Sequence, residues 1–185
     1  MGQYYRVILT NMHGREMVYN RNVNGKYTSA KLTEHSWWRN VFVSTICNKL
    51  LYNPMSVVWV GDYADDADPT NGIQGNELVR LYKKAWNNKG NDIKENKRYL
   101  DGYVLVNHTK RVYIDCDEYK KESIDRYGWC MHPLPLLTAI GNGLGGGDYN
   151  GINMKDIGSW ANDLISIEDA AHDGYTKIQC AFRED

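Results

Sequence analysis

Ser56-Val57-Val58-Trp59-Val60 is a nearly all-apolar stretch of five residues, rich in β-branched and aromatic side chains. A run of this kind is typical of a β-strand that is buried on both of its faces. Asn53-Pro54 precedes it and ends a helix, and Gly61 follows it and begins a loop. We therefore expect a short interior strand at residues 56–60.

The flanking segments predict two β-hairpins and two main helices. β-Branched and aromatic residues indicate the hairpins, and apolar side chains at four-residue steps indicate the helices, which begin at caps Ser36 and Asn76. Residues 132–135 open a short apolar turn or helix. The expected strands of the two hairpins and of the end of the chain are residues 3–9, 16–19, 103–106, 111–114 and 175–182.

These elements are arranged without a regular βαβ rhythm, and both hairpins are local. This order favours an α+β fold with a mostly antiparallel sheet, two main helices and long loops. The chain has 185 residues, which fits a single globular domain over residues 1–185. A chain of this length buries about 70% of its unfolded surface and needs no disulfide or metal to hold it together.

Composition limits the classes of partner and the compartment. The formal net charge is −1, so no long-range field attracts nucleic acid or an anionic membrane, and neither is an expected partner. No apolar run approaches the ~20 residues of a membrane span. The beginning of the chain lacks the apolar core of a signal peptide, and the four cysteines are too irregularly spaced for a metal or redox motif. We expect free, mostly buried thiols and a cytoplasmic protein.

The loop after the interior strand, residues 61–68, is the first candidate binding segment. It gathers carboxylates at a strand end, where binding sites often lie, and its candidate ligand contacts are Asp62, Tyr63 and Asp65. The register that begins at Asp66 is also similar to a calcium loop of the EF-hand kind. A plain solvated acidic loop is the alternative, because Asn71 replaces the glycine of that pattern and a strand precedes the loop. The candidate Ca²⁺ ligands are Asp66, Asp68, Thr70, the Gly72 carbonyl and Glu77.

The second candidate is a glycine-rich tract at residues 141–149. Glycines let backbone N–H groups approach an anion closely, although neither the phosphate-loop nor the dinucleotide pattern is present. The tract is expected either to pack tightly against the core or to contact a ligand. The candidate ligand contacts are Gly145, Gly146, Gly147, Asp148 and Tyr149.

His132 is the third candidate, because histidine is a ready acid–base group. Together with Asp62, Asp65 and Asp148 it would form the site of a hydrolase or nucleotide-processing enzyme, and a structural role is the alternative. The other histidines, such as His108, lie in turns or polar loops and show no spacing for a metal site. No nucleophile elbow, HExxH helix or zinc pattern is present, so enzymatic activity stays open.

Six segments spread over almost the whole chain together resemble a largely uncharacterised family of small phage, prophage and bacterial proteins. They are MGQYY at 1–5, EHSW at 34–37, WVGDYAD at 59–65, HPLPLLTA at 132–139, GGGDY at 145–149 and GSWA at 158–161. The resemblance implies a phage or prophage setting and carries over no catalytic residue.

Three functions follow as alternatives. The leading one is a phage-type accessory protein that binds a host protein or a small ligand, with counter-defence as one such role, at the surface of the 61–68 loop and the 141–149 tract. The second is the hydrolase or nucleotide-processing enzyme. The third is a calcium-stabilised structural protein.

Overall fold

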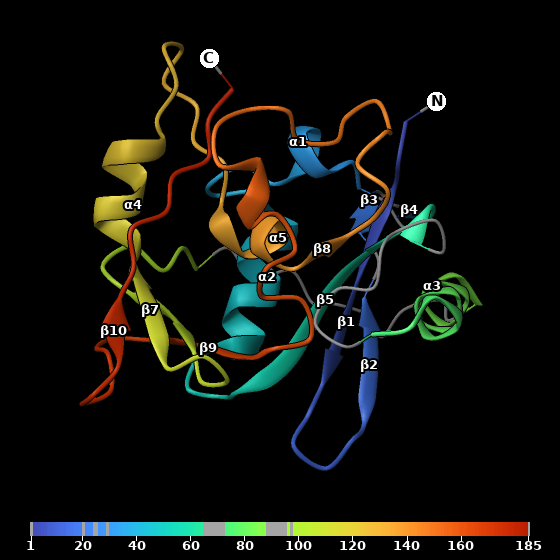
Figure 1. Cartoon of the computed structure of the whole chain (residues 1–185), viewed down its shortest axis with the longest axis horizontal. Coiled ribbons are helices and arrows are strands. Elements are labelled where there is room, and N and C mark those ends of the chain that lie inside the picture. The colour runs from blue at the N-terminus through green and yellow to red at the C-terminus, as the bar shows by residue number, and fades with distance from the viewer. Residues whose placement is uncertain are drawn as a thin grey trace.

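The computed structural model describes residues 2–19, 21–23, 26–28, 30–64, 73–87, 96 and 98–184, and these form a single α+β domain (Figure 1). The helices are α1 Leu32–His35, α2 Val41–Leu50, α3 Gly75–Asn87, α4 Cys116–Ser123 and α5 Pro133–Leu137. The strands are β1 Tyr5–Thr10, β2 Glu16–Tyr19, β3 Arg21–Val23, β4 Lys26–Thr28, β5 Met55–Gly61, β6 Val104–Asn107, β7 Val112–Asp115, β8 Ala139–Ile140, β9 Leu164–Glu168 and β10 Thr176–Lys177.

One sheet organises the domain, with the strand order β10-β7-β6-β9-β5-β1-β2 and with β8 paired to β5. The pairs β10–β7 and β5–β8 are parallel and the other pairs of this sheet are antiparallel. Both predicted hairpins are present, as β1–β2 and β6–β7. The expectation of an α+β fold with a mostly antiparallel sheet is therefore confirmed.

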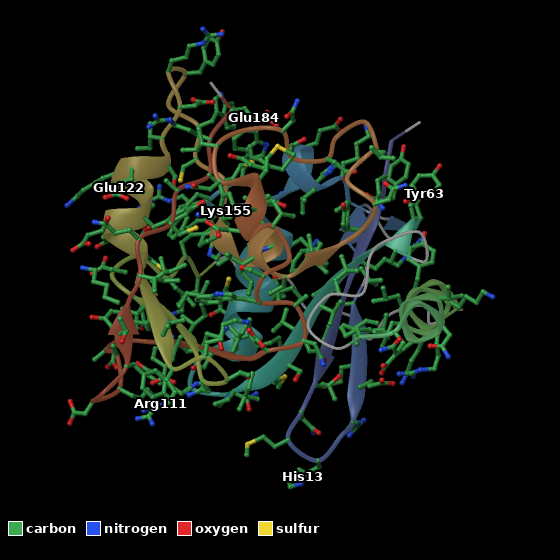
Figure 2. The ribbon with its side chains drawn as sticks, in the orientation of Figure 1. His13, Tyr63, Arg111, Glu122, Lys155 and Glu184 are labelled. Atoms are coloured by element: carbon green, nitrogen blue, oxygen red, sulfur yellow. The ribbon has the colours of Figure 1, made fainter. Side chains whose placement is uncertain are left out.

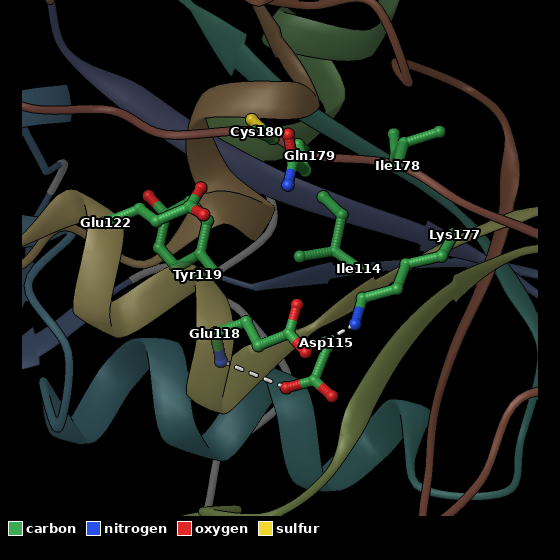
Figure 3. Close-up of a pocket in the computed structure, with 9 residues that line it drawn as sticks. All are labelled: Ile114, Asp115, Glu118, Tyr119, Glu122, Lys177, Ile178, Gln179 and Cys180. Atoms are coloured by element: carbon green, nitrogen blue, oxygen red, sulfur yellow. Dashed lines mark hydrogen bonds and ion pairs between the residues drawn. The ribbon is translucent and has the colours of Figure 1, made fainter.

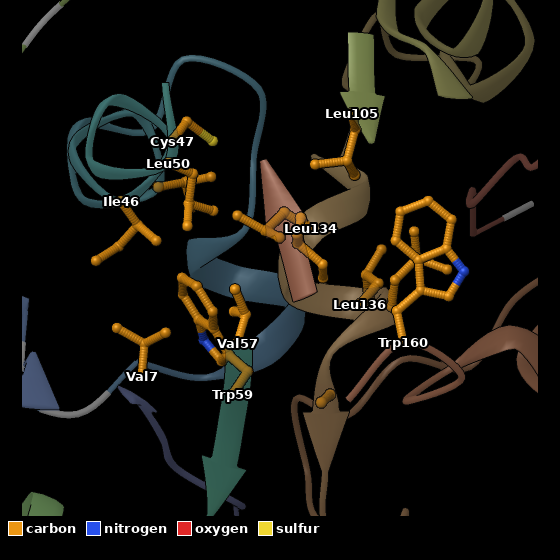
Figure 4. Close-up of a cluster of buried hydrophobic side chains, with 14 of the residues drawn as sticks. Val7, Ile46, Cys47, Leu50, Val57, Trp59, Leu105, Leu134, Leu136 and Trp160 are labelled. Carbon is orange, nitrogen blue, oxygen red and sulfur yellow. The ribbon is translucent and has the colours of Figure 1, made fainter. Parts of the chain in front are cut away.

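Strand β5 is buried on both faces, as its apolar run predicts. Successive side chains of a strand point to opposite faces, so Val57 and Trp59 enter the larger core beside α2 and α5, whereas Val58 and Val60 pack under α3. Figure 1 shows α2 and α5 on one side of the β1–β5 region and α3 on the other. Figure 4 shows Trp59 close to Val57 and Val7, with Ile46 and Leu50 of α2 above them.

Three local expectations need correction. Helix α3 begins at Gly75, so Asn76 lies inside its first turn and is not its cap. Helix α2 is capped by Asn40, whose Oδ1 accepts from Phe42 N at 3.0 Å and Val43 N at 3.3 Å, and not by Ser36, which ends the separate helix α1. The break between the two helices includes Arg39 at a φ of 68°. The final strand is only Thr176–Lys177, because the chain then turns inward and buries Phe182 in the core.

The polar helix α4 was not expected from the sequence. It begins where the Asp115 carboxylate accepts from the backbone N–H groups of Asp117 and Glu118, both at 3.0 Å. Among the described residues, no helix is both long enough and apolar enough to cross a membrane. The four cysteines are free and buried, which confirms that part of the sequence analysis.

Candidate functional site

The loop after β5 and the glycine tract meet at one buried side chain, Gln3, which has no exposed surface. Gly61, Gly141 and Gly145 all face it. A Cβ atom added at Gly61 would lie 2.7 Å from the nearest atom of the Gln3 side-chain amide, and one added at Gly141 would lie 2.5 Å from that amide. Both separations are shorter than van der Waals contact between heavy atoms allows. Close packing around Gln3 therefore accounts for part of the glycine content of the tract.

A hydrogen-bond network joins Gln3 to Tyr5 and Asp148. The neighbours set the orientation of the Gln3 amide, whose nitrogen donates to Tyr5 Oη and to Asp148 Oδ2, both at 2.8 Å. Tyr5 Oη donates to Asp148 Oδ1 at 2.7 Å, and Gly145 N donates to Asp148 Oδ2 at 2.7 Å. Asp148 is partly buried, and both of its carboxylate oxygens have protein donors.

Asp62 lies at the edge of the same network. Its Oδ1 accepts from Tyr4 N at 2.9 Å, and its charge contributes to the pKa values of both Tyr5 and Asp148. Burial is the larger cause of the raised pKa of Asp148, and the Asp62 charge raises that pKa further. Asp62 is therefore close enough to Asp148 for the two charges to interact. The hydrogen bonds of the Asp148 carboxylate are made by protein groups and need no ligand.

The rest of the glycine tract contacts α1, Gly2 and Phe182. The Gly147 carbonyl accepts from Thr33 N at 3.0 Å and from Thr33 Oγ1 at 3.1 Å, and Gly146 pairs with Gly2 in an isolated bridge. Tyr149 is buried against Phe182, with ring centroids 5.4 Å apart. Tight packing against the body of the protein, the alternative given by the sequence analysis, describes this segment well. Ligand binding by residues 145–149 stays a prediction.

Tyr5→Phe tests how much the network stabilises the protein. We expect a loss of about 1–2 kcal/mol in the free energy of unfolding, because Gln3 and Asp148 each lose a buried hydrogen-bond partner. Urea denaturation measures it, and Tyr4→Phe is the matched control at a side chain that is 42% exposed. Equal losses in the two variants would contradict a structural role for the network.

The structure places His132 in the core. Its Nδ1 accepts from Leu134 N at 3.2 Å and caps α5, and its ring stacks on Trp38 with the centroids 4.7 Å apart. Burial lowers its pKa to about 3. Within the described ranges no carboxylate contributes to that shift, and Asp65 lies outside those ranges. His132 therefore does not join Asp62 and Asp148 in an acid–base site.

Most of the predicted calcium loop lies outside the described residues, because residues 65–72 are not among them. The candidate ligands in that range are Asp66, Asp68, Thr70 and Gly72. Glu77 is described, in the first turn of α3, where its carboxylate lies 3.6 Å from an Arg80 guanidinium nitrogen. The calcium loop stays a prediction.

Two hollows on the described surface bear on ligand binding, and both are small. One, of about 210 Å³, is bounded by Asp62 and by side chains of α3, including Tyr82, whose hydroxyl accepts from Arg6 at 2.7 Å. The other holds only about 10 Å³ between α4 and residues 177–180, where Lys177 of β10 pairs with Glu118 (Figure 3). Pockets for drug-sized ligands hold about 300–1,000 Å³, so neither is large enough to enclose such a molecule.

An exposed aromatic loop at residues 124–129 was missed by the sequence analysis. Tyr127 is 71% exposed and Trp129 is 56% exposed, and the Trp129 ring lies 5.1 Å from that of Trp37. Asp125 holds the backbone, because its Oδ1 accepts from Tyr127 N at 2.8 Å and from Trp129 N at 2.9 Å. The sequence did contain a signal for this loop. Asp125 and Gly128 are spaced as in a tight turn and are followed by an aromatic residue.

The sequence analysis also missed a cluster of two histidines and a glutamate. His108, Glu168 and His172 each offer a ligand atom, and these atoms all lie within 4.8 Å of one another. The four-residue spacing of Glu168 and His172 was a partial signal. His108 joins them only because β6 pairs with β9, which no local pattern indicates.

Comparison with known proteins adds no further assignment, since no family model, curated protein or solved structure matches the chain. The resemblance to phage and prophage proteins accordingly stays a prediction.

Proposed function

We propose that this chain is an accessory protein of the phage type that acts by binding another protein, and that the 124–129 loop is the main contact surface. The observation that carries the proposal is a pair of exposed aromatic side chains, Tyr127 and Trp129, on a backbone already held in one conformation. Figure 1 shows this loop after α4, extending away from the body of the domain. The phage setting rests on the sequence resemblance alone.

The backbone of the loop is closed by four hydrogen bonds. Besides the two that Asp125 Oδ1 accepts, Asp125 N donates to Trp129 O at 2.8 Å and Gly128 N donates to Asp125 O at 3.0 Å. Gly128 has a φ of 83°, a conformation that costs a side chain-bearing residue energy. A surface that is ordered before binding loses less conformational entropy on association, which strengthens binding.

The side chains of the loop also have the chemistry of an interface. Tyr and Trp are enriched among residues that dominate binding energy, because they bury a large apolar area and lose few rotamers. The Arg126 guanidinium lies 4.8 Å from the centroid of the Tyr127 ring and adds one cation to the patch. A protein surface with an apolar recess bordered by a carboxylate fits this combination best.

The other two functions have less support. The 210 Å³ hollow beside Asp62 is below the usual size of a small-ligand pocket, and His132 is buried away from Asp62 and Asp148. The protein-binding alternative is therefore the one that the geometry favours.

The proposal is tested by affinity capture from bacterial lysate followed by native mass spectrometry of the complex. We expect one protein to co-purify in fixed ratio, and Trp129→Ser to weaken its binding by about 2 kcal/mol, or roughly 30-fold, because an aromatic anchor is lost. Leu144→Ser is the matched control, at an apolar side chain that is 85% exposed on another loop.

Hydrogen exchange of the purified complex then locates the contact. Slower exchange of the backbone amides of residues 125–129 on binding supports the proposed surface. If Trp129→Ser binds the same partner unchanged while Asp62→Ala does not, the contact lies at the loop after β5 and the proposed surface is wrong.

A further inference from the structure

The side chains of His108, Glu168 and His172 meet beside the antiparallel β6–β9 pair, in which Glu168 lies opposite Val104 and His108 follows the other end of β6. His108 follows β6, Glu168 is the last residue of β9, and His172 comes four residues later. His108 Nε2 lies 3.4 Å from Glu168 Oε1, and His172 Nε2 lies 2.8 Å from Glu168 Oε2. The His108 and Glu168 side chains are only 14% and 15% exposed, whereas that of His172 is 47% exposed.

These separations fit a four-coordinate metal. Zn²⁺ takes histidine nitrogen and carboxylate oxygen at about 2.0–2.2 Å in tetrahedral geometry, which places neighbouring ligand atoms about 3.3 Å apart. The 3.4 Å between His108 Nε2 and Glu168 Oε1 already has this value. Because the His172 side chain is 47% exposed, a small rotation of its ring would bring its nitrogen to the same distance.

Neighbouring side chains orient two of the three candidate ligands. His108 Nδ1 lies 3.2 Å from Tyr175 Oη, and His108 Nε2 lies 2.7 Å from Ser166 Oγ. A metal bound at Nε2 would replace the Ser166 contact and place the imidazole proton on Nδ1, where Tyr175 Oη is able to accept it. Ser166 Oγ donates to Glu168 Oε1 at 2.5 Å. The His172 ring stacks on Tyr175 with the centroids 5.2 Å apart. Figure 2 marks the neighbouring Arg111, whose guanidinium lies 5.6 Å from the Tyr175 ring centroid. Such outer contacts around histidine and carboxylate ligands are typical of metal sites.

We propose that His108, Glu168 and His172 bind one Zn²⁺ ion, with Tyr175 and Ser166 as positioning residues. Two imidazole nitrogens and one carboxylate favour a transition metal over Ca²⁺ or Mg²⁺, which prefer oxygen ligands alone. Three protein ligands leave the fourth position to water, and the exposed His172 side provides access from solvent. Its three ligand residues belong neither to the aromatic loop at residues 124–129 nor to the predicted calcium ligands.

The four cysteines do not compete for the ion in the folded protein. All are buried, and burial raises the pKa values of Cys116, Cys130 and Cys180 to about 12. A thiol must lose its proton to bind Zn²⁺, so these groups remain protonated and enclosed.

Titration calorimetry with ZnCl₂ on the metal-stripped protein tests the proposal. We expect binding of about one equivalent per chain. His172→Ala is the main variant, because its exposed side chain is the least involved in the fold, and we expect it to weaken binding more than about 10-fold. His13→Ala is the matched control, an exposed histidine in the β1–β2 turn, and it should bind as the unaltered protein does.

Two further measurements distinguish a built site from surface binding. Zn²⁺ should raise the melting temperature of the unaltered protein and of His13→Ala, but not that of His172→Ala or Glu168→Gln, and Ca²⁺ should not produce the shift. Co²⁺ bound in place of Zn²⁺ should give a visible absorption band that Glu168→Gln changes. Absence of binding, or equal binding by His172→Ala and the unaltered protein, would overturn the proposal and leave the aromatic-loop hypothesis untouched.

Discussion

Gly145→Ala is expected to lower the free energy of unfolding by about 3 kcal/mol or more, the cost of overpacking a core against atoms that cannot move aside. The added methyl group would lie against the Gln3 Cβ atom, and it would be only 2.5 Å from Gln3 N and 2.9 Å from Gln3 Cα. Because these are backbone atoms, a rotamer change cannot relieve the contact. The substitution would also separate Gly145 N from Asp148, which accepts from it at 2.7 Å.

Gly143→Ala is the matched control, because it lies in the same tract and has nothing within 4 Å of the added methyl group. Its φ of 69° predicts a smaller loss of about 1 kcal/mol, from backbone conformation alone. Urea denaturation of both variants measures the difference. Equal losses in the two variants would mean that glycine is required for its backbone conformation at both positions. Packing against Gln3 would then contribute little to the free energy of unfolding.

The pH dependence of stability is the second large effect, and it comes from His132. Burial lowers the pKa of this side chain to about 3, whereas an unfolded histidine has a pKa of about 6.5. Between these two pH values the unfolded chain binds a proton that the folded protein does not. The contribution of neutral His132 to the free energy of unfolding is fully present above about pH 6.5. As the pH falls toward 3, this contribution decreases by up to about 1.4 kcal/mol per pH unit.

His132→Asn isolates this contribution. Asparagine does not titrate, yet its side chain is able to accept from Leu134 N as His132 Nδ1 does, so the cap of α5 is kept. The variant should be less stable than the unaltered protein at about pH 7, because it loses the stack on Trp38 and leaves a cavity. The difference should shrink by about 2–3 kcal/mol between about pH 7 and about pH 4.5.

Urea denaturation at the two pH values is the measurement, and His13→Asn controls for removal of a histidine from an exposed turn. A difference between His132→Asn and the unaltered protein that does not change with pH would show that His132 takes up its proton in the folded state. That result would reopen an acid–base role for the side chain.

The sequence by itself determined the local elements. The apolar run of β5, the two hairpins and the short helix α5 follow from backbone geometry and from the side-chain pattern of each segment, so neighbours within a few residues suffice to predict them. It also indicated the buried cysteines, because free thiols pack as small apolar groups. The α+β class followed from the order of these elements.

Only the tertiary structure decided where the polar groups meet. Tyr5 and Asp148 are 143 residues apart and share a hydrogen bond, and His108 reaches Ser166 across a separation of 58 residues. The same holds for His132, whose pKa is lowered by its burial in the core. Such contacts depend on which strands pair and which loops pack, and the free energy that selects the pairing comes from burial over the whole chain, which no local pattern records.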